Sequence, residues 1–116
     1  GLEGLDRNKF FLTIKNLKIA NENIKFYIKK NLYENVTFIQ KKEKAILKES
    51  FFSQSDEVVF RSFVEVIKIV GKKYYPVRGK KIDRIIKSIN LHSSLKVTLG
   101  GCIIKKINGT IILLKE

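Results

Sequence analysis

The sequence predicts an α+β domain, in which amphipathic helices are followed by a small antiparallel sheet. Apolar residues recur at the spacing of a helix over three stretches, about 6–32, 56–70 and 79–89. The last section of the chain is instead rich in short runs of β-branched residues. Asn108-Gly109 lies between two of these runs, and this dipeptide is the strongest short signal for a two-residue hairpin.

The length and composition, 116 residues with 44% hydrophobic content, suit one domain with a buried core. We expect a single domain or fragment over 1–116, with a helical region over 1–90 and a β-rich end over 91–116. The chain begins at Gly1 and contains no methionine, so a piece of a larger protein is one interpretation. No apolar run approaches the roughly 18 residues that a membrane span needs, and Cys102 is the single cysteine. We therefore expect no membrane association and a reducing compartment, the cytoplasm.

The first predicted helix is the longest, and Asp6 is in position to cap its N-terminus. Its apolar stripe consists of Phe10, Ile14, Leu17, Ile24 and Ile28. Two short strands, Val36–Gln40 and Ala45–Lys48, are predicted around a polar turn at 41–44. This section of the chain therefore predicts a long helix followed by two strands.

The second predicted helix begins at an N-cap, either Ser55 or Asp56. Its buried side is expected to hold Val59, Phe63, Ile67 and Val70. Gly71 follows the last periodic residue, where a left-handed C-cap is expected. Pro76 is the only proline, and it prevents the linker before it from continuing the helix.

The third predicted helix has isoleucines on one side and basic residues on the other. The isoleucines are Ile82, Ile85, Ile86 and Ile89, and the basic residues are Lys80, Arg84 and Lys87, with Lys81 at the flank. The strands predicted after it are Lys96–Leu99, Cys102–Ile107 and Thr110–Leu114. Gly100-Gly101 marks a bend or bulge between two of them.

The chain is poor in groups that catalyse reactions. His92 is the only histidine, and beside Leu91 we expect it to be a loop or cap residue. Cys102, in a β context, is expected to be a buried structural thiol. Gly100-Gly101 lacks the spacing and the Lys-Ser/Thr pair of a phosphate-binding loop. We therefore assign no catalytic, cofactor or metal-binding residue.

Charge is distributed unevenly, because residues 71–116 carry eleven basic and two acidic side chains of a chain with net charge +13. Such asymmetry creates a positive field that attracts phosphate, so the predicted partner is nucleic acid. The candidate RNA-binding residues are Lys72, Lys73, Tyr74, Arg78, Lys80, Lys81, Arg84 and Lys87. Tyr74 and Tyr75 lie beside the basic helix and could stack on an unpaired base. The alternative for the overall charge is a bias in coding composition, since the chain is rich in Lys, Ile and Asn and has only four Arg.

Three segments then point to a family. Glu3-Gly4-Leu5-Asp6 before an amphipathic helix is similar to the segment after the family's catalytic domain. Gly71-Lys72-Lys73-Tyr74-Tyr75-Pro76-Val77-Arg78 is similar to a glycine–tyrosine–proline–arginine stretch of some members. Thr98-Leu99-Gly100-Gly101-Cys102, with Gly109 and Glu116, is similar to the β-rich end of the same region. In this order and spacing the chain resembles, over essentially its whole length, the tRNA(Ile)-lysidine synthetases (TilS, or MesJ-type proteins).

This resemblance implies a role in tRNA modification. Members of the family are ATP-dependent ligases that join lysine to the wobble cytidine of tRNA(Ile), so that it reads AUA instead of AUG. Their ATP chemistry, with Mg, belongs to an N-terminal PP-loop domain with a Ser-Gly-Gly-x-Asp-Ser motif. That motif is absent here, because Leu99 precedes Gly100-Gly101 and Cys102 follows it. The resemblance therefore implies a non-catalytic region that holds tRNA(Ile) beside the missing catalytic domain.

Two other interpretations of the sequence remain. The chain could be a docking or dimerisation module, with helix faces or sheet edges packed on a missing domain or on a second copy. It could also be an autonomous small protein that binds nucleic acid.

Overall fold

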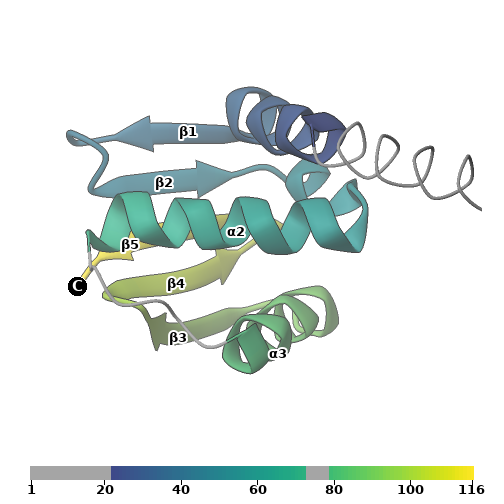
Figure 1. The fold of residues 1–116 in the computed structure, drawn as a ribbon. Coiled ribbons are helices and arrows are strands. Elements are labelled where there is room, and N and C mark those ends of the chain that lie inside the picture. The colour runs from purple at the N-terminus through teal and green to yellow at the C-terminus, as the bar shows by residue number, and fades with distance from the viewer. Residues whose placement is uncertain (1–21, 73–78) are drawn as a thin grey trace, which may run out of the picture.

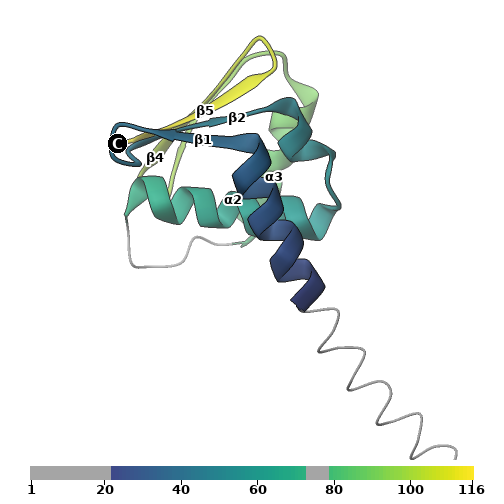
Figure 2. The same ribbon diagram turned by 90° about the horizontal axis from the view of Figure 1, so that it is seen from above.

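The computed structural model describes residues 22–72 and 79–116, and it confirms the α+β class. The helices lie on one face of a five-stranded antiparallel sheet with the strand order β1-β2-β5-β4-β3 (Figure 1 and Figure 2). In chain order the elements are a helical segment at 22–35, β1 (Val36–Ile39), β2 (Lys44–Leu47), the 3-10 helix η1 (Glu49–Ser53), α2 (Asp56–Gly71), α3 (Gly79–Leu91), β3 (Leu95–Leu99), β4 (Cys102–Ile107) and β5 (Thr110–Lys115).

The sheet combines strands from both ends of the described chain. β2 pairs with β5, from Lys44 opposite Leu114 to Leu47 opposite Ile111. The two early strands, which lie in the predominantly helical region of the sequence, therefore belong to the same sheet as the β-rich end. The pairing follows from burial, because alternate residues of both strands bury their side chains on one face.

The core lies between α2 and this face of the sheet. α2 buries the residues of its predicted stripe, together with others at helical spacing: Val58, Val59, Phe63, Val66, Ile67 and Val70. Phe51 of η1 is fully buried, and its ring contacts the ring of Phe63 edge-on, with centroids 6.5 Å apart. The sequence analysis does not predict this 3-10 helix, which supplies one of the largest side chains of the core.

The N-terminus of α2 has the local cause that the sequence predicts, whereas its C-terminus differs from the prediction. Ser55 is the N-cap, and its side chain accepts a hydrogen bond from the Val58 N–H at 3.4 Å. The prediction that Gly71 is the left-handed C-cap is wrong, since Gly71 is the last helical residue and Lys72 adopts φ 53° and ψ 31°. Gly71 is required for another reason: a Cβ atom there would overlap with the carbonyl oxygen of Gly100.

Two tight hairpins connect the last three strands. Asn108 and Gly109 have φ values of 48° and 80°, as a two-residue turn of this type needs, so the predicted hairpin is confirmed. Gly100 and Gly101, with φ of 59° and 81°, form a second such turn between β3 and β4, where the sequence predicts a bend or bulge.

A buried polar network fixes the helical segment 22–35 to the rest of the fold. The Asn31 side chain donates to the carbonyl oxygen of Phe51 at 3.3 Å, and Asn35 donates to the Asn31 Oδ1 at 2.7 Å. The Ser50 hydroxyl donates to the Asn35 side-chain oxygen. The helix ends at residue 35, three residues beyond its predicted end, and its predicted start lies outside the described residues.

Replacement of Gly71 by alanine is expected to destabilise the protein by roughly 2 kcal/mol or more. The new Cβ would overlap with the backbone carbonyl oxygen of Gly100, and backbone atoms can shift only slightly. Gly79→Ala is the matched control, since a Cβ there would contact the Phe60 ring at an ordinary 3.5 Å. It should change stability by less than about 1 kcal/mol, in the stabilising direction. Urea unfolding of both variants checks this, and equal effects would contradict the close approach.

Candidate nucleic-acid interface

The third helix, α3, has the two-sided character that the sequence predicts. Ile82 and Ile89 are 1% and 2% exposed, and Ile85 and Ile86 are half-buried against the same core. The helix extends to Leu91, two residues beyond its predicted end. Burial of the isoleucines fixes the rotation of α3, so its opposite side faces solvent.

That opposite side is basic. The basic face of α3 consists of four exposed side chains, Lys80, Lys81, Arg84 and Lys87. Asp83 is the one acidic residue of the helix. Within the described residues of the chain, none of the ion pairs involves a residue of α3. No described acidic side chain therefore neutralises these cations through an ion pair.

Lys106 holds the C-terminal end of α3. Its ammonium group donates to the carbonyl oxygen of Ile89 at 2.5 Å. A cation at a helix C-terminus is favourable, because the last carbonyl groups carry partial negative charge. Lys106 is half-buried on β4, so it ties α3 to the sheet.

Lys72 does not join the basic face of α3. Its Nζ atom is 3.6 Å from the Glu43 Oε1, and the Lys115 Nζ is 3.8 Å from the same oxygen. α3 begins beside Phe60, twelve residues before Lys72, which is about 18 Å along the axis of α2. Figure 1 and Figure 2 both show α3 away from the C-terminal end of α2. Lys73, Tyr74, Tyr75 and Arg78 lie outside the described residues.

Exposed aromatic side chains on the helical segment 22–35 were missed by the sequence reasoning. Phe26, Tyr27 and Tyr33 are 61%, 48% and 89% exposed. Lys29 and Lys30 lie between Tyr27 and Tyr33 in the sequence, and Lys25 directly precedes Phe26; all three lysines are exposed. Such interleaving of aromatic and basic residues is typical of surfaces that bind single-stranded nucleic acid. The available signal was that these aromatic residues fall outside the predicted apolar stripe.

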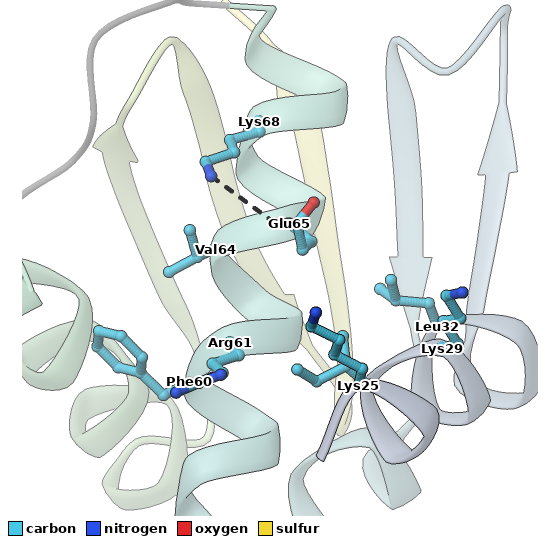
Figure 3. Close-up of a pocket in the computed structure, with 9 residues that line it drawn as sticks. Lys25, Lys29, Leu32, Phe60, Arg61, Val64, Glu65 and Lys68 are labelled. Carbon is cyan, nitrogen blue, oxygen red and sulfur yellow. Dashed lines mark ion pairs between the residues drawn. The ribbon is translucent and has the colours of Figure 1, made fainter. Parts of the chain in front are cut away.

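A groove of about 450 Å³ separates the segment 22–35 from α2 (Figure 3). Its apolar lining consists of Ile28, Leu32, Phe60 and Val64, and its charged residues are Lys25, Lys29, Arg61, Glu65 and Lys68. Arg61 pairs with Glu57 at 2.7 Å and Lys68 with Glu65 at 3.7 Å. The charges that α2 contributes are therefore largely neutralised, and the groove is less cationic than the basic face of α3.

His92 and Cys102 are the two groups with catalytic potential that the sequence analysis names. His92 is exposed directly after α3, as expected for a cap residue. Cys102 is fully buried, as predicted, and its thiol donates to the carbonyl oxygen of Ile67 at 3.4 Å. The described residues contain no cluster of three metal-ligating side chains and no helix long and apolar enough to cross a membrane.

Comparison of the chain with family models, with curated proteins and with solved structures finds no match.

The basic face of α3 is expected to be dispensable for folding. Simultaneous replacement of Lys80, Arg84 and Lys87 by alanine should change the unfolding free energy by less than about 1 kcal/mol, because the side chains are exposed and alanine favours helix. Ile82→Ala should cost roughly 2–5 kcal/mol, since it empties a buried site. Urea unfolding compares them. Equal losses would mean that the basic residues support the fold.

Proposed function

We propose that this chain binds RNA through its helical layer, with the basic face of α3 as the main contact to phosphate. The observation that carries the proposal is the set of four exposed cations on one helix, none of them in an ion pair with a described residue. Residues three and four positions apart lie along one side of a helix, so these cations can follow a phosphate backbone.

The aromatic residues of the segment 22–35 support RNA over duplex DNA. Tyr33 and Phe26 expose most of their surface, and an unpaired base can stack on such a ring. Bases inside a duplex are already stacked on each other and do not offer this contact. A folded RNA with loops and ends would satisfy both the cationic and the aromatic surface.

The resemblance of the sequence to the tRNA(Ile)-lysidine synthetases supports one RNA in particular, tRNA(Ile). We propose that the chain is the tRNA-holding, non-catalytic region of such a ligase in the cytoplasm. In this proposal the tRNA modification reaction, with its ATP and Mg, belongs to a PP-loop catalytic domain that partners this region. The chain's own residues would orient the tRNA, and none of them would touch the reacting atoms.

The test is fluorescence anisotropy of the chain with tRNA(Ile), titrated across salt concentration. Replacement of Lys80, Arg84 and Lys87 by alanine should weaken binding and reduce the slope of log affinity against log salt by roughly two to three units, because each lost phosphate contact removes close to one released counterion. A duplex DNA of similar length should bind more weakly than the tRNA.

A second triple variant, Lys44, Lys96 and Lys105 to alanine, is the matched control. It removes the same charge from the sheet, on the side away from the helices, and should retain the salt slope of the native chain. Equal weakening by both triple variants would mean that only net charge attracts RNA, and unchanged affinity in the α3 variant would exclude the proposed face. Binding of tRNA and duplex DNA alike would favour the autonomous nucleic-acid-binding protein.

A further inference from the structure

The central strands of the sheet are apolar on both faces. β5 has four consecutive apolar residues, 111–114, and β4 begins with three, 102–104. Successive residues of a strand point to opposite faces, so such runs supply apolar side chains to both. This pattern is typical of strands that are covered on both sides, whereas a sheet with one solvated face alternates apolar and polar residues.

Only one of the two faces is covered by a described element. The fully buried residues Ala45, Leu47, Ile104 and Leu113 point toward the helices. Figure 2 shows the described helices together on that side of the sheet. We call the other side the open sheet face, and its large aliphatic side chains are Ile39, Ile46, Ile103, Ile107, Ile112 and Leu114.

These aliphatic side chains are partly accessible. Ile39 is 39% exposed and Ile107 is 52% exposed, and the other four are half-buried by their neighbours in the sheet. The register places them side by side, with Ile46 opposite Ile112 and Ile103 opposite Leu114. Adjacent apolar side chains that remain in contact with water mark an interaction surface.

Lysines flank this apolar centre on both sides. Lys44 of β2 lies opposite Leu114 of β5, and Lys105 of β4 lies opposite Ile112. Lys96 of β3 lies opposite Lys105. The strand residues of the open sheet face include no Asp or Glu, and no ion pair within the described residues of the chain involves these lysines.

The spacing of the lysines matches the width of one helix. Two strand separations lie between β2 and β4, which is about 10 Å, close to the diameter of an α-helix. β5 has six residues, so it is about 20 Å long, and a helix of about 14 residues would span it. A helix above β5 would therefore have Lys44 along one edge and Lys105 along the other.

We propose that the open sheet face is a docking site for an acidic amphipathic helix of a partner protein. The occupant places an aliphatic stripe on the side chains of β5 and its neighbours, and carboxylates along both edges of the stripe meet Lys44, Lys96 and Lys105. Apolar burial supplies the affinity, and the flanking lysines select the acidic partner. This inference is independent of the proposed RNA binding, which uses the opposite layer.

Charge and chemistry argue against the other occupants. A second copy placed face to face would bring the three lysines against three more, without a carboxylate among the strand residues of the face to neutralise them. RNA would find phosphate contacts at the lysines, but no aromatic side chain lies among the strand residues of this face. Its phosphates would instead cover six aliphatic side chains, which is unfavourable.

Three synthetic helical peptides of about 14 residues test the proposal. They comprise an acidic peptide with a Leu/Ile stripe flanked by Glu, a basic peptide with Lys in place of Glu, and an acidic peptide with Ser in place of the stripe. Binding to the full chain is measured by fluorescence anisotropy. The acidic amphipathic peptide should bind at least roughly tenfold more tightly than each of the others.

Charge reversal on the protein locates the site. The double variant Lys44→Glu with Lys105→Glu should lower the affinity for the acidic amphipathic peptide by roughly tenfold or more. The control, Lys81→Glu with Lys87→Glu on α3, makes the same change in net charge and should alter this affinity by less than about twofold. Ile112→Lys should also weaken binding. Ile112→Thr, which keeps a β-branched residue in the strand, replaces it if the lysine variant does not fold.

Several outcomes would overturn the proposal. The first is equal binding of the acidic and basic peptides. The second is binding of the acidic amphipathic peptide that persists after charge reversal at Lys44 and Lys105. The third is a dimer of the chain, detected by sedimentation, that Ile112→Lys dissociates. Loss of tRNA binding in the Lys44 and Lys105 variant, with tRNA binding retained in the Lys81 and Lys87 variant, would overturn it too, because the open face would then belong to RNA. Failure of the α3 variants to affect tRNA would instead count against the proposed function alone.

Discussion

The close approach of α2 to the turn between β3 and β4 is the constraint on which the layered structure depends. A Cβ atom on Gly71 would overlap with the carbonyl oxygen of Gly100 and would lie 3.1 Å from the Cys102 sulfur. With no side chain at 71, the C-terminal end of α2 lies flat on the sheet, and Val66 and Val70 become fully buried. Any larger residue would lift this end and expose the core that α2 closes.

Placing all described helices on one face divides the surface into two regions of different chemistry. On the helical side, burial of Ile82 and Ile89 directs the cations of α3 into solvent, where phosphate can approach. On the other side, cations stand at the margins of an aliphatic surface, where a polypeptide is the better match. Lysines on α3 therefore form a cationic surface in solvent, whereas lysines on the strands flank an aliphatic surface.

Features with local causes could be predicted from the sequence. Ser55 caps α2 through its own neighbour Val58, the isoleucine spacing of α3 fixes its buried side, and Asn108-Gly109 forms its turn without distant help. Features that depend on remote partners could not. The reason for Gly71 is the carbonyl of Gly100, and the ion-pair partner of Lys72 is Glu43, from a distant part of the chain. The pairing of β2 with β5 joins residues far apart in the chain, so local spacing carries no signal for it.

The single cysteine of the chain has a chemical consequence. Cys102 is 0% exposed and lies under the C-terminal half of α2, where its thiol reaches the Ile67 carbonyl oxygen. A thiol-reactive reagent can meet this sulfur only when α2 separates from the sheet, so the modification rate reports the frequency of that opening. The rate at which Cys102 is modified therefore measures how often α2 and the sheet separate in the native state.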